Sequence, residues 1–160
     1  MRVPGVGELS SGDPASVTVQ NALGKARAAM REGQDEVIIG CDTVVYLGGT
    51  IHGKPADEST ARGMLRGLAG RTHEVLSGLA VLDGTRELTA LERTSVTFRD
   101  LGEEMLAWYL ATGEWRGRAG GYAIQGAGAA LVRAVSGDYE NVVGLPLARL
   151  LDVYPELLSL

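Results

Sequence analysis

The sequence predicts an α/β fold in which a mixed twisted sheet carries flanking helices. Three observations favour it. The chain has 160 residues, which suit one domain, and 45% of them are hydrophobic, which is enough to bury a core. Stretches with a helical spacing of apolar residues occur together with short β-branched runs. Two of the predicted strands are joined by a tight turn, so a simple repeat of strand–helix–strand units does not fit.

The first predicted elements are an irregular segment, a helix and a strand. Residues 1–14 contain three glycines, two prolines and few apolar side chains, so we expect no regular structure there. From residue 15 to about residue 31, apolar side chains recur with helical spacing. The short apolar run 36–40 predicts a buried strand, with Asp42 just beyond its C-terminal end, and strand character resumes over residues 43–47.

A second helix and a long hairpin follow. Asp57 is the expected N-cap of a helix that ends at Gly70. The β-rich stretches 72–82 and about 87–98 predict a hairpin around an Asp-Gly turn.

The last part of the chain alternates short elements with glycine-rich segments. Asp100 is the expected cap of a helix that ends at Gly113, with four side chains facing inward: Leu101, Met105, Trp108 and Tyr109. A glycine-rich stretch then precedes a short hairpin strand at 130–135, turned by Ser136, Gly137 and Asp138. Pro146 opens a final helix.

The charge and the cysteine content exclude several classes of protein. The net charge is −5 and no basic stripe occurs, so we expect no nucleic-acid partner. The single cysteine, Cys41, forms no internal disulfide and suits a reducing compartment. No apolar run approaches the ~18 residues of a membrane span, and no signal-peptide stretch occurs at the start. We therefore expect a cytoplasmic protein with no membrane partner.

Two nucleotide-binding motifs and a metal motif can be tested and rejected. Residues 48–54 spell Gly-x-x-x-x-Gly-Lys, but Pro55 stands where a P-loop needs Ser or Thr. The run 126–128 begins like a dinucleotide fingerprint but lacks the third glycine. His52 and His73 lack metal-ligand spacing, so we expect both to be structural or surface residues.

Asp42 is the strongest candidate for chemistry. A carboxylate directly after a buried strand would lie in the crevice where α/β sheets place their ligands. There it could hold a divalent metal ion, accept a proton from water, or do both. The alternative is a turn aspartate that hydrogen-bonds its own backbone. Spacing alone leaves both interpretations open.

Several cations and one amide are further candidates. Lys54 lies on a constrained loop and Lys25 on a helix, and both are equally compatible with solvated surface positions. Arg116 and Arg118, with the glycines near them, would form an anion-binding nest or merely a hairpin corner. The uncharged amide of Gln125 could read the edge of a nucleobase through its donor and its acceptor.

Five blocks of this sequence, taken together, resemble the Maf family of nucleoside triphosphate pyrophosphatases. They occur in the order found in that family and cover nearly all of the chain after about residue 17. The blocks lie at residues 37–45, 53–55, 70–78, 113–126 and 137–147. The resemblance therefore assigns residues 15–160 to one Maf-like pyrophosphatase domain, preceded by the irregular segment 1–14.

The resemblance implies hydrolysis between the α and β phosphates, giving a nucleoside monophosphate and pyrophosphate, with Mg²⁺ or Mn²⁺ as cofactor. Asp42 matches the aspartate that acts as proton acceptor in the family. Thr43 and Gln125 match positions tied to substrate choice, and Lys25 and Lys54 match lysines that are expected to face the phosphates.

The resemblance extends to the substrate and the architecture. Residues 114–122 look like the branch of the family that acts on dTTP and UTP. Members of the family have two lobes around a cleft, are cytoplasmic and are often dimeric, so a homodimer is expected.

One departure from the family pattern concerns the N-terminal end. Family chains open with a strand and a Ser-x-Ser-Pro-Arg-Arg loop that binds the triphosphate, and residues 1–14 contain no such run. We therefore expect an N-terminally truncated domain. Losing two arginine–phosphate contacts would weaken substrate binding by roughly 10²- to 10⁴-fold. The alternative function is a catalytically impaired nucleotide-binding or regulatory protein.

Overall fold

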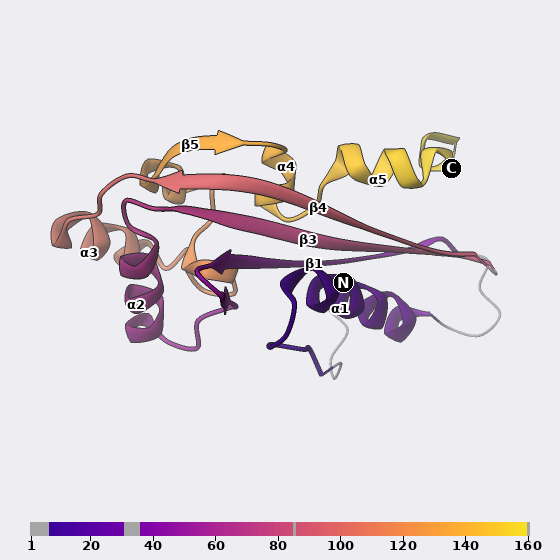
Figure 1. Ribbon diagram of the computed structural model, residues 1–160, viewed down its shortest axis with the longest axis horizontal. Helices are drawn as coiled ribbons and strands as arrows, with labels where there is room; N and C mark the ends of the chain where they lie inside the picture. Colours follow the sequence, from indigo (N-terminus) through magenta and orange to yellow (C-terminus); the bar gives the residue numbers. More distant parts are fainter. Residues whose placement is uncertain (1–6, 31–35, 85, 160) are drawn as a thin grey trace.

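The computed structural model describes residues 7–30, 36–84 and 86–159, and these form one sheet with helices packed on both of its faces (Figure 1). The helices are α1 (Pro14–Ala29), α2 (Glu58–Leu68), α3 (Glu103–Thr112), α4 (Tyr139–Val143) and α5 (Leu147–Val153). The strands are β1 (Ile38–Leu47), β2 (Thr50–His52), β3 (Thr72–Asp83), β4 (Arg86–Phe98) and β5 (Val132–Ser136). Short 3₁₀ turns follow at Ala119–Gly121, Ala127–Leu131 and Pro155–Ser159.

The strands of the described residues lie in the order β2-β1-β3-β4-β5, and every pairing between them is antiparallel. Helix α1 packs across β1 and β3 on one face of the sheet, while α4 and α5 lie on the opposite face (Figure 1). Helices α2 and α3 gather at one end, over the largest hydrophobic cluster. The predicted α/β class with flanking helices is therefore confirmed.

Strand β1 is continuous, and this corrects the prediction that Asp42 follows the end of a strand. Its ladder with β3 runs without a break from Ile38 opposite Leu82 to Tyr46 opposite Glu74. Asp42 lies inside this ladder, opposite Gly78. The prediction was wrong because a mid-strand aspartate normally signals a break, whereas here side chains of α1 satisfy its carboxylate.

Two glycines let α1 lie directly on the sheet. A Cβ atom on Gly40 would lie 2.2 Å from the carbonyl oxygen of Ala22, and one on Gly78 would lie 2.4 Å from the carbonyl of Thr18. Both neighbours are backbone atoms of the helix, so neither can rotate away. The close approach brings the polar side chains of α1 within hydrogen-bond distance of β1.

The predicted cap and end of α2 and the predicted turn of the hairpin are confirmed, whereas Gly33, the expected stop of the first helix, lies outside the described residues. The Asp57 carboxylate accepts a hydrogen bond from Thr60 N at 2.7 Å, as expected of an N-cap. Gly70 follows α2 with a φ of 65°, a conformation that favours glycine. Strands β3 and β4 form the long hairpin, with Gly84 at φ 57° in its turn.

Three predictions for the C-terminal half were wrong in detail. Helix α3 begins after Gly102 and not at Asp100. Tyr109 is buried as predicted and Leu101 and Met105 pack against the core, but Trp108 is half exposed. The other buried side chains of the helix are Leu106 and Leu110. Strand β5 pairs back onto β4 and not with a later strand, since the following Asp138 caps α4.

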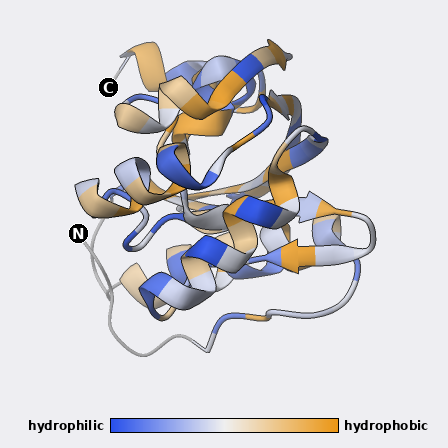
Figure 2. Cartoon of the chain, turned by 90° about the vertical axis from the view of Figure 1, so that its left-hand side faces the viewer, coloured by the Kyte–Doolittle hydropathy of each residue, from blue (hydrophilic) through white to orange (hydrophobic). Residues whose placement is uncertain are grey.

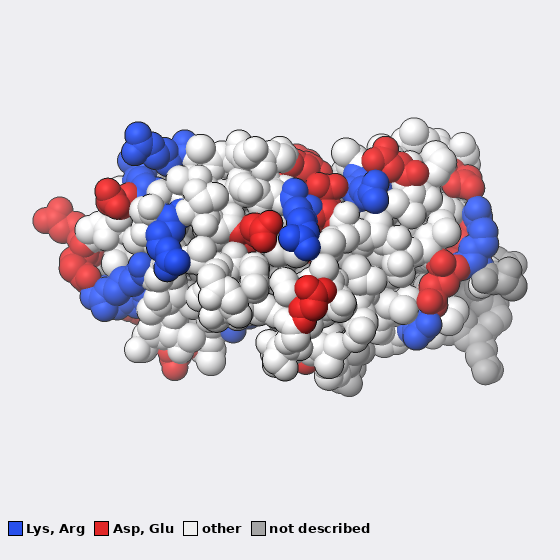
Figure 3. Space-filling model, viewed as in Figure 1, with Lys and Arg blue, Asp and Glu red and all other residues white. Residues whose placement is uncertain are grey.

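The helices and one face of the surface can be compared with the features of the sequence. Among the described residues, no helix combines the length and the apolar character needed to cross a bilayer. Polar and apolar residues are interspersed along the helices in Figure 2. On the face drawn in Figure 3, basic and acidic side chains alternate, and the basic ones form no extended patch.

Candidate functional site

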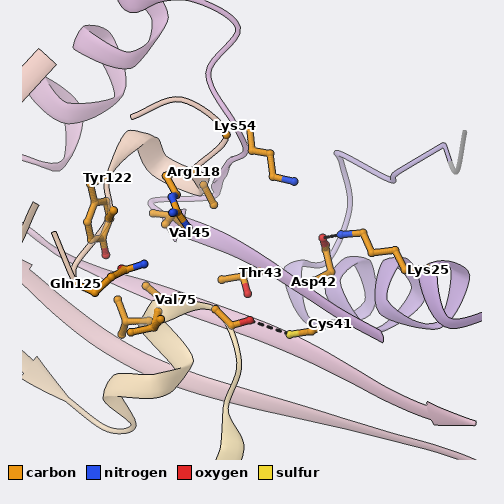
Figure 4. Close-up of a pocket in the computed structure, with 16 residues that line it drawn as sticks. Lys25, Cys41, Asp42, Thr43, Val45, Lys54, Val75, Arg118, Tyr122 and Gln125 are labelled. Carbon is orange, nitrogen blue, oxygen red and sulfur yellow. Dashed lines mark hydrogen bonds and ion pairs between the residues drawn. The ribbon is translucent and has the colours of Figure 1, made fainter. Parts of the chain in front are cut away.

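A cavity of about 260 Å³ lies at the edge of β1, and we call it the edge pocket (Figure 4). Its walls come from α1, β1, the loop after β2, strand β3, the glycine-rich segment before β5 and the end of α4. All five site residues predicted from the sequence line it: Lys25, Asp42, Thr43, Lys54 and Gln125. Segments far apart in the chain thus meet at one place.

The edge pocket reaches both faces of the sheet, because β1 is uncovered there. Strand β2 pairs with β1 only from Val45 to Leu47, so no strand of the described residues covers the edge at Asp42 and Thr43. Successive residues of a strand point to opposite faces. Asp42 therefore points toward α1, while Thr43 and Cys41 point toward α4, and all three line the same cavity.

The Asp42 carboxylate is held at both of its oxygens. Its Oδ1 atom lies 2.5 Å from Nζ of Lys25, and its Oδ2 atom accepts a hydrogen bond from Nδ2 of Asn21 at 3.0 Å. The aspartate is only 6% exposed, so its charge depends on these partners more than on water. Lys25 and Asn21 lie one helical turn apart on α1, which presents both to the strand.

Lys25 is shared by two carboxylates. Its Nζ atom also lies 2.9 Å from Oε1 of Glu8. Burial lowers the pKa of Lys25, but the hydrogen bonds with Asp42 and Glu8 outweigh it and raise that pKa above its ordinary value. The lysine is therefore a permanent cation at this end of the pocket.

Asn21 fixes the segment that carries Glu8. Its side chain accepts from Leu9 N at 2.8 Å and donates to Leu9 O at 3.0 Å. The sequence predicted neither Glu8 nor Asn21. The four-residue spacing between Asn21 and Lys25 was a signal for the asparagine, whereas nothing in the spacing pointed to Glu8.

Thr43 belongs to a polar network behind the pocket. Its hydroxyl oxygen lies 2.7 Å from that of Ser77, which is fully buried and 3.5 Å from the carbonyl oxygen of Asn141. The Asn141 amide in turn donates to Val75 O at 3.1 Å and to the Thr94 hydroxyl at 3.0 Å. The position of Thr43 is thus tied to β3, β4 and α4.

The other end of the pocket is lined by Gln125, Tyr122 and Arg118 (Figure 4). The Tyr122 hydroxyl lies 2.8 Å from Nε2 of the buried His73. Burial, together with the charge of His52, lowers the pKa of His73 to about 4, so this imidazole is neutral and structural, as expected from the sequence. Burial also raises the pKa of Tyr122, which stays protonated.

The two arginines of the glycine-rich segment differ in their relation to the edge pocket. Arg118 lines the edge pocket, whereas the guanidinium of Arg116 lies 4.5 Å from the ring centroid of Trp115, outside it. Both arginines line a second hollow together with Gln125, so the alternative of an anion-binding nest stays a prediction. Lys54, from the loop after β2, lies between Arg118 and the Lys25–Asp42 pair in Figure 4.

Cys41 lines the pocket without the features of a reactive thiol. Its Sγ atom donates to the carbonyl oxygen of Gly144 at 3.2 Å. Burial raises its pKa to about 11, so the thiolate form is scarce near neutral pH.

The described residues contain no group of three or more His, Cys, Asp and Glu side chains arranged to hold a metal ion. Two carboxylates, of Asp42 and Glu8, nevertheless converge on Lys25. One end of the cavity thus combines the Asp42 carboxylate with the ammonium of Lys25, and the other offers the uncharged amide of Gln125. Such an arrangement can hold a polyphosphate beside a proton-accepting carboxylate. At the far end it can contact a polar heterocyclic ring.

One family model and several known proteins are similar to this chain. A family model described as "Maf-like protein" matches residues 2–157. A "dTTP/UTP pyrophosphatase" of Pyrococcus furiosus is 44% identical over 140 residues, which are 88% of this chain and 74% of the relative. Proteins of the same name from Symbiobacterium thermophilum and Deinococcus radiodurans are each 46% identical. The matches cover 92% and 87% of this chain, and 77% and 71% of those relatives.

Proposed function

This chain belongs to the Maf family, and from that premise we propose that it is a nucleoside triphosphate pyrophosphatase that hydrolyses dTTP and UTP. The observation that carries the proposal is the setting of Asp42. It is a buried carboxylate, held at both oxygens, that lines a cavity also lined by Lys25, Lys54 and Arg118. The products are the nucleoside monophosphate and pyrophosphate.

In this proposal Asp42 accepts a proton from the attacking water. The water oxygen bonds to the α-phosphorus, the bond from that phosphorus to the oxygen bridging the α and β phosphates breaks, and pyrophosphate leaves with that oxygen. When Asp42 takes up the proton, Lys25 keeps Glu8 as its counter-ion. The ammonium is therefore not left as an unpaired charge during the reaction.

The remaining lining residues have positions that suit substrate binding. Lys54 and Arg118 are cations on the pocket wall and can contact the phosphate chain. Thr43 and Gln125 carry neutral donors and acceptors, which suit the sugar or the base of the nucleotide. Tyr122 adds an aromatic wall beside Gln125.

The proposed cofactor is Mg²⁺ or Mn²⁺, and the donors present fit such an ion. Mg²⁺ is typically held by one or two carboxylates together with substrate phosphates and water. Asp42, on the pocket wall, is the carboxylate that would hold it together with the phosphates of the substrate. When bound, the ion would neutralise charge on the phosphate oxygens.

The test is pyrophosphate release from dTTP, UTP, CTP, ATP and GTP, with Mg²⁺ or Mn²⁺ and with EDTA. D42N is expected to lower kcat by about 10²- to 10⁴-fold, the usual contribution of a positioned proton acceptor. The matched control is D152N, which makes the same change at an exposed position on α5.

Three outcomes would contradict the proposal or part of it. Release of inorganic phosphate and a diphosphate would show that a different bond is cleaved. Equal activity of D42N and D152N would show that Asp42 takes no part in the reaction. Nucleotide-induced thermal stabilisation of the wild-type chain without any turnover would indicate the alternative, a nucleotide-binding or regulatory protein.

We also propose that the protein is a cytoplasmic homodimer. The free thiol of Cys41 supports a reducing compartment, and family resemblance supports the dimer. Light scattering should give twice the 16.8 kDa mass of the chain. A mass equal to one chain would contradict the dimer.

A further inference from the structure

Glu114 binds the backbone directly after Gln125. Its Oε1 atom accepts a hydrogen bond from Ala127 N at 2.9 Å, and its Oε2 atom accepts one from Gly128 N at 3.2 Å. These amides follow Gln125 by two and three residues. One carboxylate therefore fixes the chain directly after the glutamine.

A second anchor holds the chain directly before Gln125. Ala123 N donates to the hydroxyl oxygen of Tyr109 at 3.0 Å, and the Tyr109 side chain is fully buried in the main core. Within the turn, Gly126 N donates to Ala123 O at 3.2 Å. Tyr109 lies on α3 and Glu114 follows its end, so one short stretch of chain anchors the turn on both sides.

Gly126 makes the contact between the Glu114 carboxylate and the amides of Ala127 and Gly128 possible. A Cβ atom at this position would lie 2.4 Å from Oε1 of Glu114 and 2.7 Å from its Cδ. A side chain larger than hydrogen would push the carboxylate away from the amides that it binds. The glycine directly after Gln125 thus allows the carboxylate to reach the turn.

The side chain of Gln125 has no such support of its own. It is exposed on the pocket wall, and no hydrogen bond joins it to another residue in the described part of the chain. Its direction therefore depends on the backbone anchors. It lines both the edge pocket and a shallower hollow that Glu114 also lines.

We propose that Glu114 is a positioning residue that determines nucleobase selectivity by fixing Gln125. The inference rests on the proposed function. Uracil and thymine present an N–H between two carbonyl groups, and an amide can pair with that edge only from a fixed direction. Nucleotides whose bases do not make this contact lose no affinity when the Glu114 anchor is removed. Loosening the turn therefore reduces the advantage of dTTP and UTP over other nucleotides.

The first experiment compares E114Q with E104Q. Glu104 is exposed on α3, so E104Q changes the charge by the same amount without touching the turn. E114Q keeps the shape of the side chain but turns a donor toward one of the two amides. We expect its KM for UTP and dTTP to rise about tenfold, while kcat at saturation and kcat/KM for CTP and ATP change less than twofold. E104Q is expected to match the wild type.

Two more variants separate positioning from general destabilisation. Q125A is expected to lose the same selectivity, and adding E114Q to Q125A is expected to cause no further loss. G126A displaces the carboxylate from the opposite side and should reproduce the effect of E114Q. Selectivity losses that add fully in the E114Q and Q125A double variant would overturn the inference.

Hydrogen exchange tests the anchor without any reliance on catalysis. The amides of Ala127 and Gly128 should be protected in the wild type and exchange faster in E114Q and G126A. Faster exchange with unchanged selectivity would overturn the inference and leave the proposed function standing. If the wild type turned over no nucleotide, the proposed function would fail. The affinity ratio of non-hydrolysable UTP and CTP analogues would then decide the role of Glu114 in the same way.

Discussion

The Nζ atom of Lys25 lies 2.5 Å from Oδ1 of Asp42, so the aspartate that we propose as proton acceptor has a built-in counter-ion. The lysine side chain is 28% exposed and that of the aspartate 7%, so the pair is only partly shielded from water. Breaking such a pair leaves a carboxylate with little solvation. The two side chains should therefore be coupled in stability as well as in activity.

K25M is expected to lower the free energy of unfolding by about 1–3 kcal/mol, because Asp42 then keeps a buried charge without its cation. The control is the double variant K25M/D42N, in which that charge is also absent and part of the lost stability should return. Urea unfolding of the four chains gives the coupling. If the losses of K25M and D42N simply add, the pair contributes nothing to stability.

The fold was predictable where local signals are strong. The capping aspartate of α2, the glycine after it and the Asp-Gly turn of the hairpin each have a defined local geometry, and all three were confirmed. The position of Asp42 within β1 was not predictable, because what satisfies its charge is distant in sequence. Lys25 lies 17 residues before it and Asn21 lies 21 residues before it. From its sequence neighbours alone, Asp42 is only a charge that interrupts an apolar run.

The candidate site was predictable as a set of residues but not as an arrangement. All five predicted residues line the edge pocket, and their individual roles stay predictions. The expectation of a crevice beyond a strand end was wrong, because that rule belongs to parallel sheets and these pairings are antiparallel. Glu8 and Glu114 were not predicted as site residues, since their contacts are set by tertiary packing; Glu114 entered only as part of the block 114–122.

Asn21 should matter for both catalysis and the local fold. N21L removes the hydrogen bond to Oδ2 of Asp42 and both contacts with Leu9. We expect kcat to fall about tenfold and the free energy of unfolding to fall by about 1–3 kcal/mol, because buried polar groups lose their partners. Q20L, at the exposed neighbouring position of α1, is the matched control. Wild-type kcat in N21L would show that Asp42 does not depend on this contact.

The contact between α1 and the sheet should be intolerant of any side chain at Gly78. G78A would place a Cβ atom 2.4 Å from the backbone of Thr18, so the helix must shift, at a cost of about 1–3 kcal/mol or more. G67A is the opposite control: it lies in α2 with open space around it, and alanine should stabilise the helix by about 0.5–1 kcal/mol. Thermal unfolding of both variants checks the signs, and a neutral G78A would contradict the close packing.

His73 should make the fold less stable in mild acid. The pKa of this imidazole falls from its ordinary 6.5 to about 4 in the folded protein, because the side chain is buried and lies near His52. Nδ1 of His73 has no hydrogen-bond partner among the described residues. The unfolded chain therefore binds the extra proton between these two values, and stability is lost as the pH falls from about 6.5 to 4.

The pKa of His73 sets the size of this loss of stability, and variants of the two histidines provide the controls. The loss should reach at most about 3 kcal/mol and be complete below the folded pKa. H73Q, which can still pair with the Tyr122 hydroxyl, should flatten the curve in that window, whereas H52Q should keep the part that comes from His73. Urea unfolding at several pH values between 7.5 and 4 measures the slope. An H73Q curve parallel to that of the wild type would assign the acid sensitivity to other groups, because a residue that cannot titrate contributes no slope.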